Sequence, residues 1–345
     1  MKEKLYGKTL SQLRAVVSDR GQAPFVASQL ADWIYKKSAT DFDSMANISR
    51  TFRAVLAEDF DIAGEAPAKE SVSADGTKKY LFPTLAKRFV EAAYIPEEDR
   101  ATLCLSTQVG CRMGCLFCMT GKQGFQGHLS AEEILNQYRS LPEREKITNI
   151  VYMGMGEPLD NLEAVLASLE VLTAEWGYGM SPRRLTVSTI GIVPGLRQFL
   201  ERSECRLAVS LHSPFDEERR SLMPVQNVYP ISEVLALLRE ADIEKSRRVS
   251  FEYILFGGLN DDRRHARELI RILSGLRCRV NLIRFHPIPD TPLLSSTEEA
   301  TVEFERTLKE AGLMATIRKS RGQDIQAACG LLSTKALVRK TDEDY

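Results

Sequence analysis

The chain has 345 residues, with 46 Lys and Arg against 47 Asp and Glu, and 43% of its residues are hydrophobic. This length suggests two domains, or one large barrel with an appendage, and the hydrophobic share excludes general disorder. No run approaches the ~20 apolar residues of a membrane-spanning helix, and the first residues lack the apolar stretch of a signal peptide. We therefore expect a cytoplasmic protein without a membrane partner.

The balanced net charge conceals two basic regions in the C-terminal half. Residues 245–284 contain ten Lys and Arg against four Asp and Glu, and residues 316–340 contain six against one. Regions of this kind can follow the phosphate backbone of a nucleic acid. Solvated helix faces would have the same composition, so both interpretations stay open.

The N-terminal part predicts a small helical domain. Apolar residues recur at helical spacing in three segments, 10–17, 26–34 and 48–56. Residues 63–76 hold few large apolar side chains and end near the turn signal Asp75-Gly76, which predicts a linker. Alternating segments at 79–82 and 89–95 then predict a β-hairpin. We expect a helical accessory domain, a linker with a hairpin, a barrel and a tail, with the boundaries 1–62, 63–96, 97–332 and 333–345.

From about residue 100 onward, strand-like and helix-like segments alternate. The candidate strands are 102–106, 149–154, 185–189, 206–211, 249–256 and 280–285, and the candidate helices are 130–140, 161–175, 193–202, 231–242, 262–275 and 298–312. Six β/α units predict an α/β fold with a parallel sheet. Because a closed barrel of this kind needs eight units, we expect a partial, open six-unit β/α barrel with active residues at the C-terminal ends of its strands.

Four of the seven cysteines lie within fifteen residues, which points to a metal site or to catalysis. Cys111, Cys115 and Cys118 have the spacing C-x3-C-x2-C, which suits three irons of a [4Fe–4S] cluster and leaves the fourth iron free for a substrate. The alternative is a zinc site with Cys104 as the fourth ligand. That alternative is less favoured, because Cys104 lies within the candidate strand 102–106.

This cysteine spacing resembles the radical S-adenosylmethionine (SAM) superfamily, in which an aromatic residue such as Phe117 commonly precedes the last cysteine. The segment 154–159, Gly-Met-Gly-Glu-Pro-Leu, is similar to the superfamily segment that binds the amino group of SAM. The resemblance implies a barrel of the radical SAM type. It also implies a set of SAM-binding residues at strand ends: Gly156, Glu157, Ser188, Ser210, Leu211, His212 and His286, the last at a position where relatives carry Asn as well as His.

Further motifs at 100–104, 108–111, 281–283 and 318–330 narrow the resemblance to the radical SAM adenine methyltransferases of ribosomal RNA. This family includes dual-specificity enzymes that methylate carbon 2 of an adenine in both 23S rRNA and tRNA. The similarity extends from the N-terminus to about residue 332. It implies one [4Fe–4S] cluster, two SAM molecules per turnover, a flavodoxin-like electron donor, and a monomer that binds 23S rRNA and tRNA. The target base would be extruded from folded RNA into the pocket, and the helical domain at 1–62 and the basic region 245–284 would contact the RNA backbone.

The resemblance also implies three catalytic residues. Cys329 would take a methyl group from one SAM, and a radical derived from a second SAM would remove hydrogen from that methyl before it adds to the adenine. Cys104 would then attack the sulfur of Cys329, which releases the RNA and leaves a transient disulfide. Glu91 would accept the proton of the ring carbon.

Alternatives stay open at each level. Glu91 could be an ordinary exposed glutamate on a hairpin, and Cys329 could be a buried, inert thiol. Within the same chemistry, a sister enzyme methylates carbon 8 of the rRNA adenine with the same two cysteines. In another class, a zinc-stabilised RNA-binding protein would use the cysteine cluster structurally. We interpret Cys205 and Cys278, which precede candidate strands, as packing residues.

Overall fold

The computed structural model describes residues 2–241 and 249–334. Part of the first basic region and most of the predicted tail at 333–345 therefore lie outside the described residues. Among the residues that are described, no helix is long and apolar enough to cross a membrane.

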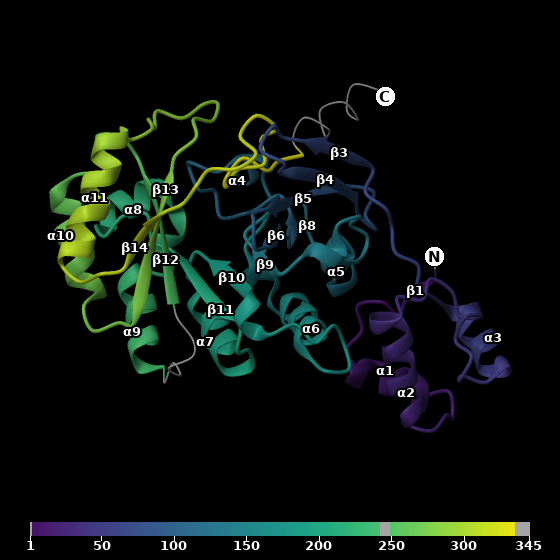
Figure 1. Ribbon diagram of the computed structural model, residues 1–345. Coiled ribbons are helices and arrows are strands. Elements are labelled where there is room, and N and C mark those ends of the chain that lie inside the picture. The colour runs from purple at the N-terminus through teal and green to yellow at the C-terminus, as the bar shows by residue number, and fades with distance from the viewer. Residues whose placement is uncertain (1, 242–248, 335–345) are drawn as a thin grey trace.

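The first 62 residues fold into helices at the three predicted positions (Figure 1), which are α1 Leu10–Ser18, α2 Phe25–Ala31 and α3 Arg50–Asp59. The side chain of Thr9 caps α1 in a capping box with Gln12, and the side chain of Ser49 caps α3, as is usual for hydroxyl residues at helix N-termini. A π-helical turn, Asp32–Lys36, continues α2. A short parallel pair, β1 Glu3–Lys4 with β2 Phe60–Asp61, joins the two ends of this domain.

In the described residues, ten strands form one sheet in the order β14-β13-β12-β11-β10-β9-β6-β5-β4-β3. Strands β6 and β9 to β14 are parallel, whereas β3 to β6 are antiparallel. The sheet is open because β14 and β3 are its two edges, as the six-unit expectation required. Its strands are β3 Lys69–Val72, β4 Lys78–Pro83, β5 Phe89–Pro96, β6 Ala101–Cys104, β9 Asn149–Tyr152, β10 Leu185–Thr189, β11 Arg206–Ser210, β12 Val249–Leu255, β13 Cys278–Arg284 and β14 Ala315–Ile317.

The helices that connect the parallel strands lie where the sequence predicted them, with two additions. Helices α4 and α8 were not predicted, because each is short and mostly polar. A separate strand pair, β7 Gln108–Val109 with β8 Gly127–His128, flanks α4. The helices are α4 Met119–Gln123, α5 Ala131–Arg139, α6 Leu162–Thr173, α7 Val193–Arg202, α8 Asp216–Leu222, α9 Ile231–Glu240, α10 Arg263–Leu273 and α11 Glu298–Glu310.

Two strands correct the sequence analysis. The linker predicted at 63–76 contains β3, an edge strand of the sequence Lys-Glu-Ser-Val whose residues are exposed or half-buried. No alternation of apolar residues marks such a strand, because neither face is fully buried. Strand β14 has only three residues and extends the parallel sheet beyond β13. After β14, the C-terminal segment, yellow in Figure 1, crosses back over the sheet toward α4 and the β3–β5 hairpins.

Candidate active site

The three clustered cysteines lie on one loop between β7 and α4. Gly110 begins this loop with a positive φ of 69°, and a Cβ there would lie 1.7 Å from the carbonyl oxygen of Gly124, so only glycine fits. The backbone N–H of Leu116 donates to the carbonyl oxygen of Leu222 at 3.0 Å, which ties the loop to α8. Cys111 and Cys115 are buried and Cys118 is half-buried.

The donor set of this loop fits an iron–sulfur cluster. Burial raises the pKa of Cys111 to about 12 and that of Cys115 well above its ordinary value, and the charge of Cys118 adds to both shifts. The two buried thiols, Cys111 and Cys115, are therefore costly to ionise unless a positively charged group binds them. In the described part of the chain, no three His, Cys, Asp or Glu side chains surround a point suited to a single metal ion. The three thiolates of an iron–sulfur cluster do not need to meet at one point, because each binds a separate iron.

The strand register places four of the predicted residues, Glu91, Cys104, Ser188 and Ser210, on one face of the sheet. Cys104 pairs with Val151, Val151 pairs with Thr186, and Ser188 pairs with Ala208. Paired residues, and residues two positions apart on a strand, project to the same face. Cys104, Ser188 and Ser210 therefore share the face that Glu91 also joins, since Ala93, two residues after Glu91, pairs with Cys104.

The segment after β9 is shaped by close contacts. Gly156 has a φ of 100°, and a Cβ there would lie 2.5 Å from the Cβ of Gln108. The carboxylate of Glu157 is buried, and its two oxygens accept the backbone N–H groups of Leu159 and Ile190, each at 3.0 Å. Burial raises the pKa of Glu157 to about 7. This carboxylate thus holds the ends of β9 and β10 together, and the backbone of 156–157 is what the segment can offer to a ligand.

His212 follows Ser210 and Leu211 at the end of β11. Its φ of 57° is unusual for a residue with a side chain, and the buried imidazole accepts the backbone N–H of Ile254 at Nδ1, at 3.0 Å. This contact places the ring proton of the neutral form on Nε2. Burial lowers the pKa of His212 to about 3, and the ring lies edge-on to Phe117 with 4.7 Å between centroids. His212 and the cysteine loop, through Phe117, are therefore in direct contact.

His286 lies two residues beyond β13 and faces the C-terminal segment. Its Nε2 lies 2.9 Å from the hydroxyl oxygen of Ser320, and the side-chain amide of Gln323 also contacts the ring. Burial lowers the pKa of His286. Its contacts within the described residues thus link the strand end to the segment that precedes Cys329.

The structure brings Cys104 and Cys329 together. Cys104, the last residue of β6, packs with Ala93 and with Ala327, two residues before Cys329. The carbonyl oxygen of Gly330 accepts the backbone N–H of Met119 at 2.8 Å, which also places Cys329 beside the cysteine loop. Cys104 packs with Ala93 and Ala327, and in the described residues no three His, Cys, Asp or Glu side chains could hold one metal ion, which argues against Cys104 as a fourth zinc ligand.

The two thiols differ in their surroundings. Burial raises the pKa of Cys104 to about 12, and the charge of Cys329 adds to this shift. Cys329 is exposed, so the alternative of a buried, inert thiol is wrong. Enough protein surrounds the Cys329 sulfur, however, for desolvation to raise its pKa as well. Cys329 is therefore an exposed residue whose sulfur is desolvated by the protein around it.

Glu91 is buried on β5, so the alternative of an exposed hairpin glutamate is wrong. One carboxylate oxygen lies 2.9 Å from Nζ of Lys79, and the other accepts the backbone N–H of Ser333 at 2.9 Å. Burial raises the pKa of Glu91, while the charge of Lys79 opposes this shift. A buried carboxylate with a raised pKa is a stronger base than an exposed one.

Two charged groups at the site were not among the predicted site residues, although Arg318 begins the motif 318–330. Arg219 on α8 is fully buried, and its guanidinium donates to the carbonyl oxygens of Ile190, Ser210 and Leu211 at 2.9, 3.2 and 3.2 Å. An arginine on a short polar helix is indistinguishable from a solvated residue before the fold is known. Arg318 lies 3.5 Å from the buried carboxylate of Glu252, and its charge opposes the effect of burial on the pKa of both Cys104 and Cys329.

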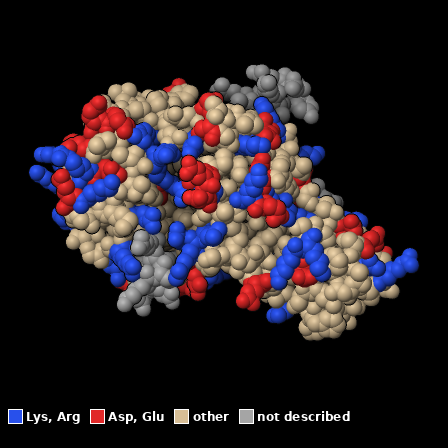
Figure 2. Space-filling view, in the orientation of Figure 1, with Lys and Arg blue, Asp and Glu red and all other residues tan. Residues whose placement is uncertain are grey.

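The predicted basic surface is partly neutralised where it is described. Arg263 pairs with Glu303 at 3.0 Å, Arg271 with Glu268 at 2.5 Å, and Arg284 with Glu298 at 2.6 Å. On the face that Figure 2 shows, Lys and Arg are intermixed with Asp and Glu. Ion pairs therefore take up part of the positive charge that the sequence places in 245–284.

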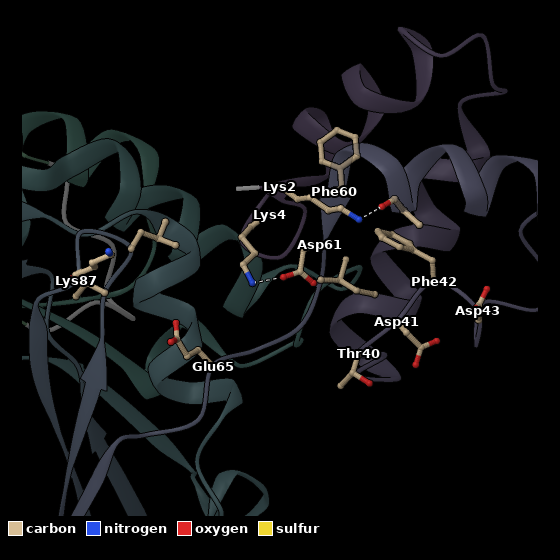
Figure 3. A pocket seen from close by; sticks show the side chains of 14 residues that line it. Lys2, Lys4, Thr40, Asp41, Phe42, Asp43, Phe60, Asp61, Glu65 and Lys87 are labelled. Atoms are coloured by element: carbon tan, nitrogen blue, oxygen red, sulfur yellow. Dashed lines mark hydrogen bonds and ion pairs between the residues drawn. The ribbon is translucent and has the colours of Figure 1, made fainter.

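A cavity of about 610 Å³ lies between the N-terminal domain and the β4–β5 turn (Figure 3). Its lining includes lysines and acids together, and Lys4 on β1 pairs with Asp61 on the adjacent strand β2 at 2.6 Å. None of the predicted catalytic, SAM-binding or cluster-binding residues lines this cavity.

Two family models match the chain. The radical SAM superfamily matches residues 105–270, and the ribosomal RNA large subunit methyltransferase N-terminal domain matches residues 4–62. The first match covers the cysteine loop and the strand ends, and the second covers the helical domain. The predicted resemblance is confirmed on both parts.

Similar proteins cover nearly the whole chain. A protein of Porphyromonas gingivalis described as a probable dual-specificity RNA methyltransferase RlmN is 56% identical over 330 residues, which are 96% of each chain. The dual-specificity RNA methyltransferase RlmN of Syntrophus aciditrophicus is 42% identical and covers 96% of this chain and 97% of its own. The crystal structure of a radical SAM methyltransferase from Sphaerobacter thermophilus matches with a TM-score of 0.88 and 41% identity, over 96% of this chain and 99% of that one. The chain belongs to the RlmN family of radical SAM RNA methyltransferases.

Proposed function

We propose that this protein methylates carbon 2 of an adenine in 23S rRNA and in tRNA, with Cys329 as the carrier of the methyl group. The observation that carries the proposal is the meeting of Cys104 and Cys329 beside the three-cysteine loop. A cysteine with only a packing role would be buried, whereas Cys329 is exposed and lies close to the buried thiol of Cys104. The names of the relatives, which specify dual-specificity RNA methyltransferases, support the choice of substrates.

Cys111, Cys115 and Cys118 would hold one [4Fe–4S] cluster, which supplies, when bound, the electron that cleaves SAM and generates a radical. The backbone of Gly156 and Glu157, with Ser188, Ser210, Leu211, His212 and His286, would bind SAM at the strand ends. A flavodoxin-like protein would deliver the electron to the monomeric enzyme. Two SAM molecules would be consumed per turnover, one to methylate Cys329 and one to activate that methyl group.

The two cysteines and Glu91 would divide the later steps. The activated carbon on the sulfur of Cys329 forms a bond to the adenine, so that RNA and protein are covalently joined. The adduct radical would lose one electron, which would return to the oxidised cluster, and the ring-carbon proton, which Glu91 would accept. The thiolate of Cys104 would then attack the sulfur of Cys329, and the electron pair of the carbon–sulfur bond would pass to the methylene carbon. That carbon would take up a proton and become the methyl group of the released base, while the two sulfurs form a disulfide.

The test compares Cys104→Ala, Cys329→Ala and, as a matched control, Cys278→Ala. Cys278 is half-buried at the start of β13, away from the site, so its variant should retain full activity. Cys329→Ala should form no covalent RNA complex, whereas Cys104→Ala should accumulate RNA attached to the peptide that contains Cys329. An adduct in Cys329→Ala, or none in a Cys104→Ala protein with its full iron content, contradicts these roles. Mass spectrometry of the released nucleoside distinguishes methylation at carbon 2 from methylation at carbon 8.

A further inference from the structure

The segment that precedes Cys329 is held by the turn between β3 and β4. The carboxylate of Asp324 accepts the hydroxyl of Ser73 at 2.6 Å and the backbone N–H of Ala74 at 3.1 Å. In return, the carboxylate of Asp75 accepts the backbone N–H of Gly322 at 3.0 Å. Two carboxylates, one from each side, thus join two segments that are far apart in the sequence.

This contact continues through the backbone toward Cys104. The backbone N–H of Ala327 donates to the carbonyl oxygen of Gly322 at 2.8 Å, which closes residues 322–327 into a compact turn. Gly322 has a φ of 62°, and a Cβ there would lie 2.8 Å both from Cγ2 of Thr77 and from Cβ of Ala327. Because Ala327 packs against Cys104, the β3–β4 turn, the closed segment and the buried thiol form one continuous set of contacts.

On its other side, Cys329 is followed by a second set of fixed contacts. The carbonyl oxygen of Gly330 accepts from Met119, and that of Leu332 accepts from the hydroxyl of Thr120 at 2.7 Å. The backbone N–H of Ser333 donates to Glu91. Cys329 therefore lies on a short span between two anchors, and the position of each anchor limits where its sulfur can be.

We propose that the β3–β4 turn, residues 73–77, is a clasp that positions Cys329 within reach of Cys104, with Asp324 and Ser73 as positioning residues. This inference rests on the proposed function for the roles of the two cysteines. It gives a functional role to β3, one of the two strands that the sequence analysis did not predict. Loss of the clasp enlarges the volume in which Cys329 moves and lowers its effective concentration at Cys104.

The test measures disulfide formation between the two cysteines in the cluster-loaded, full-length protein. Glutathione disulfide takes up two electrons and two protons from the thiols of Cys104 and Cys329 and becomes two glutathione molecules. Mass spectrometry of the linked peptide at several glutathione ratios gives the equilibrium constant. Wild-type protein, Asp324→Ala and Asp324→Asn are compared with Asp99→Ala, an exposed acid in the turn between β5 and β6.

Asp324→Ala should lower the equilibrium constant at least tenfold, because both hydrogen bonds are lost, and Asp324→Asn should have an intermediate value, because the amide oxygen can still accept one. Asp99→Ala should equal the wild type. Asp324 is exposed, so its variants should keep the fold, and Ser73→Ala provides a second variant with the same direction. An unchanged constant in both Asp324→Ala and Ser73→Ala, or the absence of this disulfide in the wild type, overturns the proposal.

Alkylation rates separate positioning from general loosening. Iodoacetamide should modify Cys329 at an altered rate in Asp324→Ala while the rate at Cys278 stays constant, and parallel acceleration at both cysteines contradicts a specific clasp. The assays use neither RNA nor SAM. A protein that fails to methylate RNA but shows the tenfold change therefore refutes the proposed function and not the clasp.

Discussion

The release of RNA from the protein should accelerate about tenfold for each unit of pH between 7 and 9. Burial raises the pKa of Cys104 to about 12. Since only the thiolate attacks sulfur, a group with that pKa supplies its reactive form in about one molecule in 10⁵ at pH 7, and the fraction rises tenfold per pH unit. In the covalent adduct the sulfur of Cys329 carries no charge, so burial alone remains as the main cause of the raised pKa of Cys104.

The assay is a single turnover in which the adduct is first accumulated and its disappearance is then followed at several pH values. The logarithm of the release rate should rise with a slope of 1 against pH. Because the charge of Arg318 opposes the effect of burial on the pKa of Cys104, Arg318→Met should slow release at every pH without changing the slope. The exposed neighbour Lys319→Met is the control and should behave as the wild type. A rate that does not depend on pH would refute the reasoning, because it would mean that Cys104 is already ionised or does not limit release.

Three further predictions concern the cluster, the SAM site and acid stability. Replacing Cys111, Cys115 or Cys118 by Ala should each remove the cluster, and a full iron and sulfide content in any variant contradicts the assignment. Glu157→Ala removes the two hydrogen bonds that hold the ends of β9 and β10 together, so thermal stability should fall, and calorimetric SAM affinity should fall with it because the backbone of 156–157 loses its fixed position; unchanged affinity contradicts its role. The pKa of His212 is lowered by burial to about 3, so the stability that its neutral form contributes is present above the unfolded value of about 6.5 and is lost as pH falls toward 3. His212→Asn should therefore lose less stability than the wild type between pH 7 and pH 4 in urea titrations, and equal losses contradict the prediction.

The sequence by itself determined the barrel and the cluster loop, because their signals are local. Strand β11 contains a short buried apolar run, Leu-Ala-Val, and α7 carries apolar residues at helical spacing, so both lie close to the predicted residues. The spacing of Cys111, Cys115 and Cys118 is likewise a property of one loop. The roles of Cys104, Cys329 and Glu91 were predicted only from the family resemblance, because no local sequence pattern identifies these three residues as catalytic.

Only the tertiary structure decided what surrounds those residues. Glu157 was expected to meet a ligand, yet its carboxylate accepts backbone N–H groups at two strand ends. Arg219 and β3 gave no periodic signal, because one is a charge on a short polar helix and the other is a polar edge strand. Their functions arise from hydrogen bonds between segments that are distant in sequence: Arg219 joins the ends of β10 and β11, and the turn after β3 holds Asp324. Such contacts exist only after the sheet has set its register, which is why a pattern along the chain cannot contain them.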